Sequence, residues 1–436
     1  MNIKPQQLEM FVASHIAESL GESSRLMEMI LERRNMFRAL NQVRGNKGAP
    51  GVDGMTVNQL GGYLKRHWLK VRENLFNSNY NPFPARRKEI DKPDGGVRLL
   101  GIPTVLDRLI QQAVAQIVEQ VWEPTFSEFS YGFRPGRSAH DAVQQAKSYL
   151  LDGYTYTVDM DLSKFFDRVN HDRLMSRLAT KIQDKRVLKL IRRYLTSGTM
   201  IEGTTIYAEE GTPQGGPLSP LLSNIVLDEL DKELESRGHK FVRYADDFMI
   251  YCKSSKAAER VKTSITGFIT VKLKLKVNEE KSAVSRLWLR KFLGFTFISM
   301  CGQTKIRIHL KAIKSFKDKI RELTDRNFGK SLNQIIEKLN EYLRGWWNYY
   351  RLTEAKYILK ALNSWIIRRL RCLVWKHWKN PRSKVRNLKK FGIAHKYAVS
   401  CGNARKKHWR MSKVKWVAIA LPKEYFLRLG LFLPGT

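Results

Sequence analysis

Two short segments of the sequence carry paired aspartates of the kind that bind metal ions. Asp159 and Asp161 lie in the segment Tyr154–Asp161, which is rich in strand-forming residues, and the two-residue period of a strand puts both side chains on one face. Asp246 and Asp247 are adjacent between apolar flanks, as in a hairpin whose tight turn presents two acids. Asp159 has a second interpretation, because an acid close to basic residues is often only one half of a surface ion pair.

Carboxylates that are crowded together repel one another unless a cation lies among them. Mg²⁺ binds oxygen ligands, typically one or two carboxylates with substrate phosphates, and a pair of ions can bind both the attacking and the leaving oxygen of phosphoryl transfer. Asp161, Asp246 and Asp247 fit this chemistry, and they predict a catalytic site with two Mg²⁺ ions. The string Tyr244–Asp247 is moderate evidence by itself, because a Tyr-x-Asp-Asp pattern occurs by chance in about 4% of chains of this length.

The chain is strongly basic. Of its 436 residues, 78 are Lys or Arg and 41 are Asp or Glu, which gives a net charge of +37. Such a surface, with aromatic residues among the bases, binds polyanions through phosphate contacts and counterion release, so nucleic acid is the expected partner. An anionic membrane is the rival polyanion. The sequence has no run of about 18 apolar residues and no signal-type N-terminus, so we expect a cytoplasmic protein without a membrane partner.

The elements that position the aspartates are expected to form an α+β core. Between about residues 82 and 300, a helix at Val105–Val121 alternates with β-branched and aromatic segments. The predicted strands are Thr155–Asp161, Phe241–Tyr244, Phe248–Cys252 and Phe292–Ile298. Upstream, apolar residues at helical spacing predict one helix over Arg25–Arg44. Downstream, basic amphipathic helices are predicted over Lys311–Leu323, Leu332–Tyr350 and Tyr357–Trp378.

Taken in order along most of the chain, these segments resemble the group II intron-encoded reverse transcriptases. The segments that resemble polymerase motifs A, B and C are Asp159–His171, Gly211–Pro220 and Tyr244–Asp247. Those that resemble motifs D and E are Lys274–Ser282 and Phe292–Phe297. The segments similar to the fingers of the family are Lys92–Arg98, Gly101–Arg108 and Tyr131–Arg137. The order of the whole set makes a chance match negligible.

The resemblance implies a right-hand polymerase of the α+β class, with fingers, a palm built on an antiparallel sheet, a helical thumb and a small basic C-terminal segment. In this family the thumb is also the maturase X domain, which grips intron RNA. The implied parts are an N-terminal extension with the start of the fingers (1–81), fingers (82–153), the palm with motifs A to E (154–304), the thumb (305–380) and a basic segment like a DNA-binding domain (381–436). The fold of the last segment is not assigned, and a solvated tail is the alternative.

The resemblance also implies nucleotide-binding residues. Lys92 and Arg98, on a Gly-rich hairpin, would bind the incoming triphosphate. The ammonium group of Lys92 would act as a point charge, and the guanidinium of Arg98 as a planar, two-pronged donor. Gln214 would lie against the sugar, because the glycines after it let the backbone approach closely. Phe166 matches the aromatic residue that crowds the 2′ position and favours deoxynucleotides, with the alternative that Phe165 and Phe166 are both core. The full predicted set is Lys92, Arg98, Phe166, Gln214 and Lys281.

Basic residues interleaved with aromatic ones predict nucleic-acid contacts in the fingers and thumb. The predicted residues are Arg134, Arg137, Arg344, Trp347, Arg368, Arg369, Arg371 and Lys376. About half of the thumb aromatics are expected to pack between helices instead. The stretch Arg382–Lys415 is a candidate for contact with DNA.

The cysteines and histidines do not suggest a second metal site. The cysteines, none of which forms a Cys-x-x-Cys pair, are Cys252, Cys301, Cys372 and Cys401, and they are predicted to be reduced thiols. Many relatives carry an HNH endonuclease with cysteine pairs, whereas His395, Cys401 and His408 are scattered. The chain therefore resembles the shorter branch of the family, which lacks this endonuclease.

The expected function is RNA-directed DNA synthesis by a protein that also assists splicing and retrohoming of a group II intron. A primer 3′-hydroxyl attacks the α-phosphate of a dNTP, and pyrophosphate leaves. The expected partners are group II intron RNA, an RNA template with a DNA or RNA primer, target DNA and dNTPs, and a homodimer is left open. Two alternatives stay open: an RNA-binding splicing cofactor that does not use the polymerase site, and a reverse transcriptase of another bacterial lineage, of the retron, defence or diversity-generating type.

Overall fold

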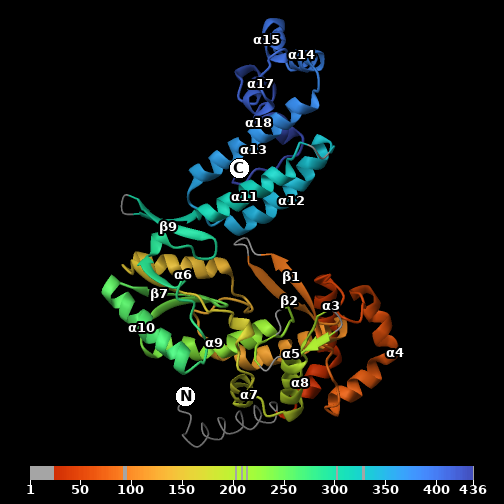
Figure 1. Cartoon of the computed structure of the whole chain (residues 1–436), viewed down its shortest axis with the longest axis vertical. Coiled ribbons are helices and arrows are strands. Elements are labelled where there is room, and N and C mark those ends of the chain that lie inside the picture. The colour runs from red at the N-terminus through yellow and green to blue at the C-terminus, as the bar shows by residue number, and fades with distance from the viewer. Residues whose placement is uncertain are drawn as a thin grey trace, which may run out of the picture. The chain divides into compact units, whose positions relative to one another are not determined.

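The computed structural model describes residues 24–91, 96–201, 204–207, 210–212, 215–300, 303–326 and 329–435, without the side chains of residues 98, 299 and 300. The chain divides into two units, Met1–Ser285 and Arg286–Thr436. Figure 1 shows their helices and strands. The division precedes the predicted palm boundary at residue 304, because a strand before that boundary packs on a helix after it. The ring centroid of Phe295 lies 5.7 Å from that of Tyr349 and 5.2 Å from that of Tyr350.

A four-stranded sheet in the first unit carries the predicted aspartates. Its order is β6-β7-β3-β8, and its strands are β3 (Tyr156–Met160), β6 (Lys240–Tyr244), β7 (Asp247–Cys252) and β8 (Ala283–Arg286). Strand β7 is antiparallel to both of its neighbours, β6 and β3. Helix α6 (Ala139–Leu151) packs on β6, and α10 (Ser255–Val271) packs on β3 and β7 (Figure 1). The strands predicted between residues 155 and 252 are confirmed.

A second four-stranded sheet, of order β2-β1-β4-β5, contains the predicted basic hairpin. Its strands are β1 (Ala85–Asp91), β2 (Val97–Ile102), β4 (Thr199–Ile201) and β5 (Thr204–Ile206). Strands β1 and β2 are antiparallel, and Asp91 pairs with Val97 at the end of the ladder. Strand β4 runs parallel to β1. The hairpin is thus confirmed by its strands, while Lys92 and residues 93–95 lie outside the described residues.

The predicted helix near residue 105 is confirmed as α5 (Val105–Trp122), whose side chains are largely buried. Other helices of this unit are α2 (Leu26–Leu31), α3 (Arg33–Gly45), α4 (Val57–Phe76), α7 (His171–Ala179), α8 (Lys185–Thr196) and α9 (Ser219–Ser236). Helices α2, α3, α4 and α9 pack on α5. The prediction of one helix over Arg25–Arg44 is wrong, because Glu32 has an extended backbone (φ −58°, ψ 138°) that separates α2 from α3.

A buried carboxylate ties α5 to the neighbouring segments. Asp107 accepts hydrogen bonds from the hydroxyls of Thr104 (2.7 Å) and Tyr80 (2.8 Å). It also accepts from the hydroxyl of Tyr194 (3.3 Å) and from the backbone N–H of Phe83 (3.2 Å). Burial raises the pKa of Asp107, and the hydrogen bonds oppose this rise. Because Tyr80 and Phe83 precede β1 and Tyr194 lies in α8, this carboxylate fixes the base of the β1–β2 hairpin.

We expect Asp107→Ala to lower the free energy of unfolding by about 3 kcal/mol, because several buried donors would lose their acceptor. The raised pKa of Asp107 means that the folded protein keeps this proton to a higher pH than the unfolded chain. Its contribution to stability therefore falls as the pH rises from the ordinary carboxyl pKa through the raised value. Urea unfolding measures the change, with Asp172→Ala as the control because the Asp172 side chain is 83% exposed. Equal unfolding midpoints for the two variants would contradict this role.

The second unit begins with a hairpin and continues as helices. Strand β9 (Phe295–Met300) pairs with β10 (Gln303–Ile308). Strand β9 starts three residues later than predicted, because Leu293 and Gly294 have positive φ angles of 49° and 82°. The helices are α11 (Leu310–Leu323), α12 (Leu332–Tyr350), α13 (Lys356–His377), α14 (Pro381–Lys390), α15 (His395–Gly402), α16 (His408–Met411), α17 (Lys415–Ala420) and α18 (Lys423–Arg428). The three predicted thumb helices are confirmed.

The C-terminal segment is folded rather than a solvated tail. Its residues Leu421 and Phe426 are buried in the same core as Leu339 of α12. The side chain of Asn340 donates a hydrogen bond to the carbonyl of Gly430 (2.7 Å) and accepts one from the N–H of Phe432 (2.8 Å). These contacts attach the end of the chain to the thumb helices.

The described residues bear on two further expectations. Within them, no helix is long and apolar enough to cross a membrane. Cys252, Cys372 and Cys401 are buried and carry free thiols, and burial raises the pKa of Cys252 to about 11. Cys301 lies outside the described residues, and the reduced state of the thiols stays a prediction.

Candidate catalytic site

The hairpin of β6 and β7 ends in a two-residue turn that carries the paired aspartates. Tyr244 and Asp247 form the last strand pair, so Ala245 and Asp246 make the turn. Ala245 has a φ of 58°, a left-handed value that is uncommon for a residue with a Cβ atom. Asp246 is half-buried, and Asp247 is exposed. The predicted turn with two adjacent acids is confirmed.

Asp161 lies at the same end of the sheet because β3 and β7 are neighbours. Their last pair is Met160 with Phe248, so the next position in the antiparallel register sets Asp161 opposite Asp247. Asp161 is half-buried. The fold therefore brings three aspartates, from segments far apart in the sequence, to one edge of the sheet.

A loop before β8 holds the backbone of Asp161. The N–H of Asp161 donates a hydrogen bond to Oγ of Ser282 (3.0 Å), and its carbonyl accepts one from the N–H of Asn278 (2.8 Å). The predicted residue Lys281 is exposed in this loop, and its N–H donates to Oδ1 of Asn278 (3.4 Å). Ser282 and Asn278 were not predicted as site residues. Their position in a motif D-like segment was the signal that could have found them.

The donor set of this edge suits Mg²⁺. Mg²⁺ binds hard oxygen ligands, and it is usually held by one or two carboxylates with waters and substrate phosphates rather than by a cage of protein groups. Across the described parts of the chain, no group of three or more His, Cys, Asp or Glu side chains could hold a metal ion by itself. The three aspartates supply carboxylate oxygens, and nucleotide phosphates would have to complete the shell of a divalent cation bound there. Asp159 pairs with Met249, two residues farther from this edge.

A cavity of about 250 Å³ is lined by parts of three segments that resemble family motifs. Its lining includes Gly101 of β2, Phe166 after β3, and Thr212 before α9. The N–H of Thr212 donates a hydrogen bond to the carbonyl of Phe166 (2.6 Å). Phe165 is 3% exposed, whereas Phe166 is half-buried, and their ring centroids are 5.3 Å apart. Phe165 is thus core, and Phe166 lines the cavity.

The glycine-rich loop next to Gln214 lies against β2. Gly215 has a φ of 119°, and a Cβ atom there would lie 2.4 Å from the carbonyl oxygen of Gly101. This close approach of two backbones explains the glycine. Gln214 lies outside the described residues, and so does the side chain of Arg98, whose backbone belongs to β2.

The structure corrects the expectation for Arg134 and leaves that for Arg137 open. Arg134 is 8% exposed, and its guanidinium pairs with Glu123 (2.7 Å) and donates to the carbonyls of Ser127 and Ser130. Its hydrogen-bonding groups face the interior, so Arg134 holds its own loop instead of contacting nucleic acid. Arg137 is half-buried and donates to the carbonyl of Glu128 (2.9 Å).

In the second unit, the predicted nucleic-acid residues also hold neighbouring segments together. Four of them donate to backbone carbonyls: Arg368 to Trp409 (3.1 Å), Arg369 to Arg321 and Thr324 (3.2 Å each), Arg371 to Leu421 (2.7 Å) and Lys376 to Arg326 (2.8 Å). The guanidinium of Arg344 lies 5.3 Å from the ring centroid of Phe432. Trp347 lines a cavity of about 800 Å³ together with Arg371. Their contacts with nucleic acid stay predictions.

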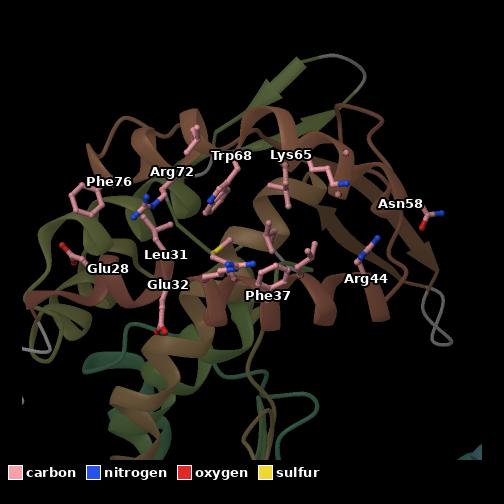
Figure 2. Close-up of a pocket in the computed structure, with 18 residues that line it drawn as sticks. Glu28, Leu31, Glu32, Phe37, Arg44, Asn58, Lys65, Trp68, Arg72 and Phe76 are labelled. Atoms are coloured by element: carbon pink, nitrogen blue, oxygen red, sulfur yellow. The ribbon is translucent and has the colours of Figure 1, made fainter.

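A larger cavity, of about 1010 Å³, lies among α2, α3 and α4. Figure 2 shows the aromatic side chains of Phe37 and Trp68 in it, with the basic groups of Arg44, Lys65 and Arg72. The lining contains none of the three aspartates and none of the predicted nucleotide-binding residues. It is therefore separate from the candidate catalytic site.

Two family models match segments of this chain. Residues 90–297 match the family "Reverse transcriptase (RNA-dependent DNA polymerase)", and residues 313–392 match "Group II intron, maturase-specific domain". The chain is 34% identical over 361 residues to Protein YkfC of Escherichia coli (strain K12), an alignment that covers 72% of this chain and 92% of that protein. It is 29% identical over 437 residues to the group II intron-encoded protein LtrA of Lactococcus lactis subsp. cremoris, an alignment that covers 78% of this chain and 73% of that protein. A solved structure of telomerase from Candida albicans has 15% identity and a TM-score of 0.42, covering 76% of this chain and 65% of that one.

Proposed function

The chain belongs to the family of group II intron-encoded reverse transcriptases and maturases, and we propose that Asp161, Asp246 and Asp247 form its polymerase site and bind two Mg²⁺ ions. The protein is an RNA-directed DNA polymerase with a right-hand fold and a maturase domain, and its polymerase reaction depends on a divalent metal. The observation that carries the proposal is the register of β3 and β7, because both strands end at the edge where the aspartates lie.

In this site Asp161 and Asp246 would hold the ions, and Asp247 would support them. When bound, the two ions stabilise the charge on the attacking and leaving oxygens. The hydrogen bonds from Asn278 and to Ser282 fix the backbone position from which the Asp161 side chain extends. The oxygen of a primer 3′-hydroxyl loses its proton to water and bonds to the α-phosphorus of the dNTP, while the bond from that phosphorus to the bridging oxygen breaks and pyrophosphate leaves.

We assign binding of the dNTP to Lys92, Arg98, Phe166, Gln214 and Lys281. Phe166 lines the 250 Å³ cavity, which supports a role in selecting the sugar. Lys281 lies in the loop that holds Asp161, which supports a place close to the same nucleotide. The assignments of Lys92, Arg98 and Gln214 rest on the family motifs alone.

Replacing Phe166 by Ala is expected to raise the use of ribonucleotides relative to deoxynucleotides by roughly 10- to 100-fold. The smaller side chain would leave room for the 2′-hydroxyl of a ribonucleotide, which the ring of Phe166 crowds. The ratio of kcat/KM for dCTP and CTP on one RNA template measures this. Phe165→Ala is the matched control, since the neighbouring ring is core and its loss should cost stability without changing the ratio. An unchanged ratio in Phe166→Ala would remove this residue from sugar selection.

We propose group II intron RNA, a primed RNA template and target DNA as the partners, with splicing and insertion of the intron as the outcome. The net charge of +37 supports attraction to all three polyanions. Contact of the C-terminal segment with DNA is supported by a cavity of about 730 Å³ along α14 and α15, whose lining includes Arg382, Arg386, Lys389 and Lys390. A cytoplasmic location is part of the proposal, because intron RNA and dNTPs are the substrates.

Removal of the metal tests the proposed chemistry. We expect the protein to extend a DNA primer on an RNA template with dNTPs and Mg²⁺, to stop when EDTA is added, and to resume with excess Mg²⁺. RNA binding, measured by fluorescence anisotropy, should change little, because it depends on phosphate contacts. Tight binding of structured intron RNA without extension under any divalent cation would favour the splicing cofactor that leaves its polymerase site unused.

A further inference from the structure

Arg243, the residue before Tyr244, has a fully buried side chain that contacts the aspartate turn. Its guanidinium makes an ion pair with Asp231 of α9, through Nε (2.7 Å) and Nη2 (2.6 Å), and both side chains are 0% exposed. Nη1 donates to Oδ1 of Asn224 (2.9 Å), also on α9, and to the carbonyl of Ala245 (3.1 Å). One planar group thus joins helix α9 to the turn.

The backbone of Arg243 and the side chain of Asn224 are themselves held by further hydrogen bonds. The backbone N–H of Arg243 donates to the carbonyl of Phe129 (2.9 Å), and its carbonyl accepts from the N–H of Tyr131 (2.9 Å). Asn224, which is 1% exposed, donates its amide to the carbonyl of Gly132 (2.9 Å). Because Asn224 and the paired aspartate are about two helical turns apart on α9, they present their side chains on one face. The donor to Ala245 therefore has a fixed position.

The backbone conformation of the turn is unfavourable and needs stabilising contacts. A left-handed backbone costs a residue with a Cβ atom roughly 1–2 kcal/mol, and Ala245 has this conformation. Its carbonyl belongs to the same planar peptide unit as the N–H of Asp246. A hydrogen bond to that carbonyl therefore fixes the plane from which the Asp246 side chain departs.

The energetics of buried ion pairs also favour a role for Arg243 in fixing the geometry of the turn. The free-energy cost of burying two charges is about as large as the gain from their attraction. A protein with an apolar pair of similar volume in place of the ion pair is therefore often equally stable. A buried pair beside a turn of uncommon conformation is better explained by the geometry it imposes. Helix α9 also begins at Ser219, shortly after the glycine-rich loop, so it connects that loop with the turn.

We propose that Arg243 is a positioning residue of the polymerase reaction. Held by Asp231 and Asn224 of α9, it fixes the Ala245 carbonyl and thereby directs the carboxylate of Asp246 toward the metal ion. This inference rests on the proposed function, in which Asp246 is a metal ligand.

The variant Arg243→Lys tests the inference, because an ammonium keeps the charge facing Asp231 but lacks the fork that reaches Asn224 and Ala245 together. Arg177→Lys is the matched control, since Arg177 pairs with Asp228 (2.7 Å), on the same helix as Asp231. We expect Arg243→Lys to lower kcat of primer extension by roughly 10- to 100-fold, as for residues that orient metal ligands. Mn²⁺ affinity, measured by EPR with a dideoxy-terminated primer on its template and a dNTP, should weaken by a similar factor. Arg177→Lys should leave both quantities unchanged.

Wild-type kcat and Mn²⁺ affinity in folded Arg243→Lys would overturn the inference. If that variant fails to fold, the double variant Arg243→Met/Asp231→Leu removes both charges of the pair and takes its place. Weakened Mn²⁺ affinity in the folded double variant supports the inference, and unchanged affinity overturns it. Failure of the proposed function gives a different result from failure of this inference. If the intact protein extends no primer and binds no Mn²⁺, the proposed function itself is wrong.

Discussion

Replacement of Asp246 by Asn is expected to slow primer extension by roughly a thousandfold or more, which corresponds to about 4 kcal/mol of lost transition-state stabilisation. The amide has nearly the shape of the carboxylate, so the turn can keep its conformation, but it lacks the negative charge that a divalent cation requires. Asp246 is half-buried in the turn between β6 and β7. Single-turnover extension on an RNA template measures the effect.

Asp172→Asn is the control for this change. The Asp172 side chain is 83% exposed and pairs with Arg192 (2.6 Å), a surface contact that is worth little. Both variants should bind RNA like the intact protein, because phosphate contacts dominate that affinity. If Asp246→Asn extends primers at the rate of Asp172→Asn, Asp246 is not a metal ligand.

The parts of the site that follow local patterns could be predicted from the sequence. Alternating strand formers predicted β3, and two acids between apolar flanks predicted the turn after β6. The pairing of β3 with β7 has no such local signal, because helices α7 to α9 lie between them in the sequence. The metal-binding chemistry of carboxylates and the resemblance to a family, rather than any local pattern, suggested that Asp161 would meet Asp246. The hydrogen bond from Asp161 to Ser282 likewise joins residues 121 positions apart.

The failures have physical reasons. Arg134 was predicted to contact nucleic acid, but Glu123 and two nearby carbonyls bind its guanidinium in the interior. Glu32 breaks a helix although the apolar spacing continues across it, since spacing reports which face is buried and not where the backbone turns. The C-terminal helices α16, α17 and α18 have four to six residues, too few for helical periodicity to be seen.

The second large effect is expected for Gly132→Ala, because the backbone of residue 132 lies against the aspartate turn. A Cβ atom at Gly132 would be 2.3 Å from the backbone nitrogen of Ala245 and 2.9 Å from the carbonyl carbon of Tyr244. Neither backbone atom can yield without shifting the turn, and Arg243 ties both segments together through its backbone hydrogen bond to Tyr131. A displacement of about 1 Å at a catalytic group can cost about 100-fold in rate, and we expect a loss of that size.

Gly267→Ala in α10 is the matched control, because a Cβ atom there meets nothing within 4 Å. It should gain up to about 1 kcal/mol of stability from helix propensity and keep the full rate of extension. Thermal unfolding of both variants separates a shifted turn from a lost fold: Gly132→Ala should melt cooperatively and still bind RNA while extending primers slowly. A Gly132→Ala protein as active as Gly267→Ala would mean that the turn moves without penalty. In that case the precise position of Asp246 would not limit the reaction, and the reason for a glycine at 132 would be packing alone.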